Sequence, residues 1–115
     1  MDIKGLYNEI GGDYQRVFAR LNSNEIIAQG IKQLAQSNCY NTFLHEYIHE
    51  NYENACRAIY DLSEMAVSLG FDRLSSACLK ITDAMLGGRN EVNDDMLAEL
   101  NSSYKEITDI INKYI

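Results

Sequence analysis

The sequence predicts an all-α protein built around an antiparallel four-helix bundle. Two observations support this fold class: the 115 residues contain no proline, and apolar residues recur with helical spacing along most of the chain. Proline interrupts helix interiors, so its absence is typical of long helices joined by short turns. Because one domain usually takes roughly 150 residues, the length predicts a single domain over residues 1–115.

An N-terminal extension of short helices is expected over residues 1–21. The first helix covers residues 3–10 and ends at Gly11 and Gly12, because glycine readily adopts the positive φ angles found at helix ends. A second helical piece covers residues 13–21. The extension therefore consists of two short helices.

Asparagines mark the next two helix starts. Asn22 precedes Glu25 by three residues, which is the spacing of a capping box and predicts the start of a third helix. Asn38 and Asn41 predict a turn, after which a short helix follows over residues 42–50. The apolar stripe of the third helix consists of Ile27, Gly30, Ile31, Leu34 and Ala35.

A central helical hairpin is predicted over residues 51–86. Asn51 is a favourable N-cap for a long helix that reaches Leu69, and Gly70 ends this helix. The next helix covers residues 72–86 and must fold back, because so short a connection reaches no further. The two inward stripes are Ala55, Cys56, Ile59, Leu62, Ala66 and Leu69, and Leu74, Ala77, Cys78, Ile81, Ala84 and Met85. The last helix starts near Asp94 and carries Leu97, Leu100, Tyr104, Ile107, Ile111 and Tyr114.

Charge and composition exclude several classes of partner. The net charge is −7, whereas a nucleic-acid-binding protein needs a basic face that displaces counterions from phosphates. The same charge disfavours an anionic membrane surface, and no apolar run approaches the length of a spanning helix. Cys39, Cys56 and Cys78 form no C-x-x-C pair. We therefore expect a cytoplasmic protein that binds neither nucleic acid nor membrane and carries no cofactor.

One short motif suggests metal chemistry. His45, Glu46 and His49 read H-E-x-x-H, which in zinc proteases supplies two imidazole ligands and a general base. A catalytic zinc site needs a third protein ligand, and the chain contains no other histidine. Glu64 is a conceivable third ligand, but its spacing is not typical. We therefore expect solvent-facing histidines and no metal site, and a zinc-dependent hydrolase remains an alternative.

Six residues of the predicted hairpin form a spaced pattern: Ala55, Arg57, Leu62, Leu69, Gly70 and Leu74. The pattern resembles, in register and without gaps, the central hairpin of histidine-containing phosphotransfer (HPt) domains. Residues 7–21 also resemble the N-terminal extension of a bacterial subgroup of this family. The resemblance implies an HPt-like four-helix bundle and a place in bacterial two-component phosphorelay signalling.

Three hallmark residues of the family are replaced. Tyr60 occupies the position of the phosphorylated histidine, Ser63 that of a lysine, and Glu64 that of a glycine. A phenol is a weak nucleophile at neutral pH and forms a stable phosphate ester, so it suits phosphate transfer poorly. His45 and His49 precede the long helix and are not expected to act as phosphoacceptors instead. We therefore expect a pseudo-phosphotransfer domain that is not an enzyme.

The resemblance also implies a docking face. It would consist of Tyr60, Ser63, Glu64 and Val67 and would bind a response-regulator receiver domain or a histidine kinase. We expect a monomer or a weak dimer. A structural or oligomerising helical bundle without a signalling partner remains a further alternative.

Overall fold

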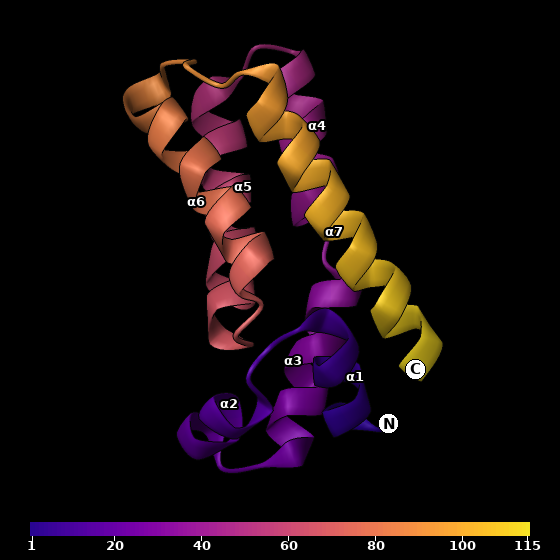
Figure 1. Ribbon diagram of the computed structural model, residues 1–115. Helices are drawn as coiled ribbons and strands as arrows, with labels where there is room; N and C mark the ends of the chain where they lie inside the picture. The colour runs from indigo at the N-terminus through magenta and orange to yellow at the C-terminus, as the bar shows by residue number, and fades with distance from the viewer.

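The structure, a computed structural model, describes residues 1–115 and consists of helices and connections without any β-strand (Figure 1). The prediction of an all-α protein is confirmed. The α-helices are α1 (Ile3–Ile10), α2 (Tyr14–Leu21), α3 (Asn24–Gln36), α4 (Cys39–Ile48), α5 (Tyr52–Ser68), α6 (Asp72–Met85) and α7 (Asp94–Tyr114), and a short 3-10 turn, η1, covers Leu86–Gly88. None of these helices combines the length and the apolar character that crossing a bilayer requires.

The central hairpin organises the molecule. Helix α5 packs against both α6 and α4, and α6 packs in turn against α7. The short helices α1, α2 and α3 gather at the end of the hairpin where α5 turns into α6 (Figure 1). Helix α5 therefore runs from the end of the molecule that contains η1 to the end covered by α1, α2 and α3.

One cluster of buried apolar side chains runs through all seven α-helices. All six residues predicted to face inward from the second helix of the hairpin are buried. In the first helix, five of the six predicted residues are buried, and Cys56 is only partly covered. Helical periodicity was therefore sufficient to identify the core face of both helices.

The start of α3 differs from the prediction. Ser23, not Asn22, is its N-cap, and the Ser23 hydroxyl accepts a hydrogen bond from the Ile26 amide at 3.3 Å. Asn22 instead ends α2 with a φ of 56°, in the left-handed region that asparagine tolerates better than most residues. The capping box predicted from Asn22 and Glu25 is therefore wrong by one residue.

Helix α4 begins three residues earlier than predicted. The chain is extended at Ser37, whose hydroxyl accepts a hydrogen bond from the Cys39 amide at 3.1 Å, and α4 starts at Cys39. Asn41 consequently lies in the first turn of α4 and not in the preceding connection. At the other end, Glu50 adopts a left-handed φ of 62°, which separates α4 from α5. Asn51 precedes α5 as predicted, although its side chain makes no capping hydrogen bond.

Gly70 forms the turn between α5 and α6. Its φ is 69°, its amide donates to the Val67 carbonyl at 3.1 Å, and the Phe71 amide donates to the Ala66 carbonyl at 2.9 Å. This pair of bonds closes the C-terminus of α5 in the manner of a Schellman motif. A Cβ atom on Gly70 would lie 2.7 Å from Val17 Cγ2, so the turn also allows α2 to approach closely.

The N-terminal helices are fastened to this turn. The buried Tyr7 hydroxyl donates to the Leu69 carbonyl at 2.6 Å, and Arg16 forms an ion pair with Asp72 at 3.0 Å. The Arg20 guanidinium donates to the carbonyls of Val67 and Ser68 at the end of α5. Helices α1 and α2 thus pack against the α5–α6 end of the hairpin and are bonded to it through polar contacts.

Candidate functional site

Helix α5 presents a half-exposed row of side chains to solvent. Tyr60 is 46% exposed and Val67 is 48% exposed, and Glu64 is exposed between them. Their spacing of four and three residues places all three on one face of the helix. The surface expected around the position of the family's phospho-histidine is therefore accessible at three of its four predicted residues.

Ser63 does not belong to this surface. Its side chain is only 1% exposed, and its hydroxyl donates to the Tyr60 carbonyl at 2.6 Å. The prediction that Ser63 contributes to a docking face is wrong, because position 63 follows Ile59 by four residues and lies on the buried side of α5. The periodicity of the core stripe carried this signal in the sequence.

Negative charge surrounds the Tyr60 hydroxyl. A hydrogen bond with Glu64 raises the pKa of Tyr60 above its ordinary value, and the charges of Glu64 and Asp61 raise it further. The phenol therefore remains protonated at neutral pH. A neutral phenol next to two carboxylates is a poor nucleophile towards a phosphoryl group, which is itself negatively charged.

Tyr60 also borders a groove of about 560 Å³ between α5, α6 and η1. Leu79 and Leu86 belong to its apolar part, and they are 39% and 52% exposed. Neither residue was expected at a site, because both lie off the inward stripes that defined the hairpin. Large apolar residues outside such a stripe are the signal that would have identified them. The complete lining is Glu53, Cys56, Arg57, Tyr60, Leu79, Thr82, Asp83, Met85, Leu86, Gly87 and Gly88.

The two histidines lie together near the end of α4. Both side chains are exposed, their ring centroids are 4.4 Å apart, and His49 Nδ1 lies 2.8 Å from the His45 carbonyl oxygen. The Glu46 side chain is not exposed like the two histidines. One of its carboxylate oxygens is buried and has no hydrogen-bond partner. The structure assembles no group of three or more His, Cys, Asp or Glu side chains that could hold a metal ion. Glu64 is thus not brought to the histidines as a third ligand.

Two of the three cysteines, Cys56 and Cys78, have thiols that burial keeps protonated. Cys78 is fully buried, and burial raises the pKa of its thiol to about 12. Burial also raises the pKa of Cys56, whose sulfur lies 3.6 Å from the Thr82 carbonyl oxygen. A reactive cysteine needs the opposite shift, towards the thiolate at neutral pH. These two residues therefore act as parts of the core and its edge.

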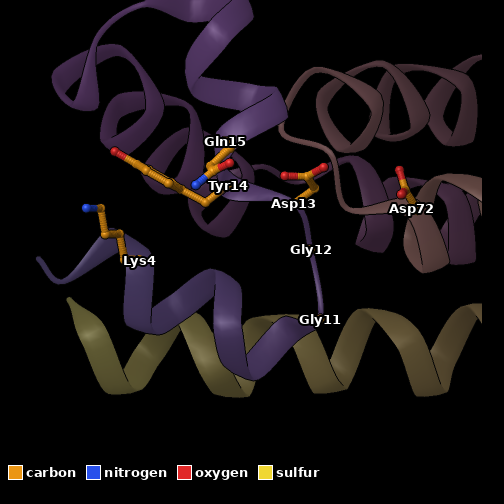
Figure 2. A pocket seen from close by; sticks show the side chains of 7 residues that line it. All are labelled: Lys4, Gly11, Gly12, Asp13, Tyr14, Gln15 and Asp72. Atoms are coloured by element: carbon orange, nitrogen blue, oxygen red, sulfur yellow. The ribbon is translucent and has the colours of Figure 1, made fainter.

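A second hollow, of about 520 Å³, lies where the N-terminal helices meet α6. Figure 2 shows Lys4 and Tyr14 on one side of it and Asp72 on the other, with Asp13 and the Gly11–Gly12 connection between them. Asp72 is engaged by Arg16, and the Lys4 ammonium lies 5.7 Å from the Tyr14 ring centroid. Its polar groups thus serve contacts among α1, α2 and α6.

Comparison of the chain with protein-family models, curated proteins and solved structures finds no match. The resemblance to HPt domains accordingly depends on the hairpin pattern and on residues 7–21 alone. Gly70, at the turn, belongs to that pattern, whereas Tyr60 departs from it.

Proposed function

We propose that this chain is an HPt-like module of bacterial two-component signalling that binds a receiver domain or a histidine kinase without carrying phosphate itself. One observation carries the proposal. The segment that resembles the HPt hairpin is a tight helical hairpin, and Tyr60 is accessible on the exposed face of its first helix. The residue at the position of the phospho-histidine is therefore placed where a partner can reach it.

The helices α4 to α7 are the four helices that we assign to an HPt-like bundle. Helix α5 packs against α4 and α6, and α6 packs against α7. Tyr40 of α4 and Tyr104 of α7 stack with their ring centroids 4.0 Å apart, and the Tyr40 hydroxyl also donates to Asn101. These contacts support a closed ring of four helices, with α1, α2 and α3 at one end of it.

Binding without phosphate transfer follows from the chemistry of the exposed face. HPt domains transfer phosphate through an imidazole nitrogen, whereas Tyr60 offers a neutral phenol beside Glu64. The buried Ser63 cannot supply the positive charge that the family's lysine provides at that position. The groove beside Tyr60 instead offers apolar contact through Leu79 and Leu86, which suits the desolvated centre of a protein interface.

A titration monitored by NMR tests the binding. Unlabelled receiver domains and kinase domains from neighbouring genes would be added to the ¹⁵N-labelled chain, and we expect shifts at Tyr60, Val67 and Leu79. The variant Leu79→Asp should weaken binding at least about tenfold, because it places a charge in the apolar part of the interface. Ile48→Asp is a matched control, since Ile48 is 74% exposed but lies on α4, outside the groove. Shifts confined to other surfaces, or none with any partner, would disprove the proposal.

A radiolabel assay tests the loss of phosphate transfer. We expect no label on the wild-type chain when it is mixed with a phosphorylated receiver or kinase. Tyr60→His combined with Glu64→Lys should gain acid-labile label, because it places an imidazole and a cation on one helix face. Ser63 is left unchanged in this design because it is buried. Acid-labile label on the wild-type chain would contradict the assignment and point to His45 or His49.

An oligomerising bundle is the second candidate, because the exposed apolar side chains beside the groove also suit a second copy of the chain. Light scattering after size exclusion distinguishes the two functions. A dimer that dissociates in Leu79→Asp but persists in Ile48→Asp would assign the groove to self-association. A mass that remains monomeric at high concentration leaves the groove free for a signalling partner.

A further inference from the structure

The two histidines at the end of α4 form a pair that the proposed signalling function does not use. We propose that His45 and His49 together bind one divalent transition-metal ion, such as Zn²⁺ or Ni²⁺, in a non-catalytic site on the surface. Both side chains are exposed, and their ring centroids are 4.4 Å apart. Residues four apart on a helix face the same side, so one ion can contact both rings.

The hydrogen bond of His49 selects its metal-binding nitrogen. Nδ1 lies 2.8 Å from the His45 carbonyl oxygen, and a carbonyl oxygen only accepts hydrogen bonds. The proton of the neutral ring must therefore be on Nδ1, which leaves the lone pair on Nε2. Metal-ligating histidines are usually oriented by such a bond from the second ring nitrogen. The His49 ring is thus held in the tautomer that binds metal through Nε2.

The charges of the neighbouring sequence favour a cation. No lysine or arginine occurs between Lys32 and Arg57, whereas this stretch contains Glu46, Glu50 and Glu53. The nearer of the two cationic residues along the chain, Arg57, is 3.9 Å from the Glu53 carboxylate. His45 and His49 also lie at the C-terminus of α4, where the helix dipole is negative.

The site differs from a catalytic zinc centre. No third side chain joins the pair, so water must complete the coordination of the ion, and the affinity is lower than in closed sites with four protein ligands. Binding would bridge the last turn of α4, directly before the left-handed residue Glu50 that leads into α5. An ion that binds only the folded chain stabilises it more as the ion concentration rises, so metal should raise the thermal midpoint.

Calorimetric titration with Zn²⁺ and with Ni²⁺ at pH 7.5 tests the proposal. We expect one ion per chain, and we expect His45→Gln and His49→Gln each to weaken binding by about a hundredfold, because the second imidazole binds intramolecularly. The double variant His49→Gln, Glu50→His is a matched control: it keeps two histidines but moves one off the shared face. It should bind as weakly as His49→Gln alone.

Two further readouts keep the result independent of folding. Circular dichroism should show that the variants remain helical, and ¹⁵N-detected NMR should show that Zn²⁺ shifts Nε2 of His49 while Nδ1 stays protonated. Binding that survives both single variants would assign the ion to other groups of the chain and overturn the proposal. Metal affinity of the control variant equal to that of the wild-type chain would overturn the proposal as well. So would the absence of stoichiometric binding to the wild-type chain.

Discussion

Tyr60 and its neighbours show how single residues change the chemistry of a helix face. The Tyr60 hydroxyl is accessible, but its hydrogen bond with Glu64 favours the neutral phenol. Ser63 uses its hydroxyl within the helix, as a donor to the Tyr60 carbonyl, and adds nothing to the surface. The face consequently combines apolar area with negative charge, and the proposed binding without phosphate transfer is based on this combination.

Removing the carboxylate of Glu64 should lower the pKa of Tyr60. In Glu64→Gln the phenolate loses a neighbouring negative charge, so ionisation becomes easier and the pKa moves towards the ordinary value. Titration of the ¹³Cζ resonance of Tyr60 measures this change. Glu53→Gln is the matched control, because Glu53 also lies on exposed α5 but pairs with Arg57. An unchanged Tyr60 pKa in Glu64→Gln would show that the hydrogen bond is not formed in solution.

At the scale of elements, the turn between α5 and α6 depends on glycine for two reasons. Gly70 has a φ of 69°, which disfavours residues with a Cβ, and the Val17 side chain of α2 fills the space that a Cβ would need. Gly87 has a similar φ of 74°, but no atom lies within 4 Å of a Cβ built on it. A substitution at Gly87 therefore measures the cost of the backbone conformation alone. A substitution at Gly70 adds the cost of the close contact with Val17.

Alanine substitutions at these glycines should differ in effect. Gly87→Ala should lower the free energy of unfolding by about 1–2 kcal/mol, the cost of a left-handed conformation. Gly70→Ala should pay the same cost and, in addition, about 1–3 kcal/mol for overpacking against Val17. Urea denaturation of both variants measures the difference. Equal destabilisation would show that α2 does not press on the turn in solution.

At the scale of the whole molecule, the packing of α1 and α2 against the hairpin connects distant parts of the chain. The Tyr7 ring is 1% exposed and lies 5.5 Å from the Phe71 ring, and its hydroxyl donates to Leu69. Two residues further along α1, Glu9 pairs with Lys113 of α7 at 3.1 Å. The N-terminal residues 1–21 are therefore part of the fold, with a buried residue at the contact.

The burial of Tyr7 makes the free energy of unfolding fall as the pH rises in the alkaline range. Burial raises the pKa of Tyr7 in the folded state, whereas in the unfolded chain it is about 10. The stabilisation by the neutral Tyr7 phenol is complete below pH ~10. It is lost as the pH rises above this value, because the phenol of the unfolded chain loses its proton before that of the folded chain. Burial acts similarly on Cys78, whose pKa of about 12 exceeds its ordinary value of 9.0, so this part is lost from about pH 9 upwards.

The variant Tyr7→Phe should separate these contributions. At pH 7 it should lower the free energy of unfolding by about 1 kcal/mol, because the Leu69 carbonyl loses its buried donor. Above pH 10 the variant should lose stability less steeply than the wild-type chain. Urea denaturation between pH 7 and pH 11 measures both effects. Parallel pH profiles for the two proteins would show that Tyr7 is not buried as a neutral phenol.

Helix positions and core faces followed from local sequence patterns. The predicted bounds of the first helix, residues 3–10, agree with α1, and the glycine stop at Gly70 is confirmed. Errors occurred where two polar residues compete for one cap, as at Asn22 and Ser23. Local hydrogen bonds of similar energy decide such cases, and residue type alone does not rank them.

The surface was less predictable than the core. Periodicity was enough to separate the buried from the exposed side of α5, and Ser63 was misplaced only because the family pattern was followed instead. The groove beside Tyr60 needed Leu79 and Leu86 from α6 and η1, whose proximity to Tyr60 arises from the hairpin turn. The orientation of the His49 ring likewise depends on a contact with His45 that the motif does not specify.

The sequence by itself determined the fold class, the helices and their apolar faces, because these depend on interactions between residues three or four positions apart. Only the tertiary structure decided that α1 and α2 hold the end of the hairpin and that Tyr60 borders an apolar groove. It also decided that the two histidines receive no third ligand. These features join residues far apart in the chain, and their distances are set by how the helices pack against one another.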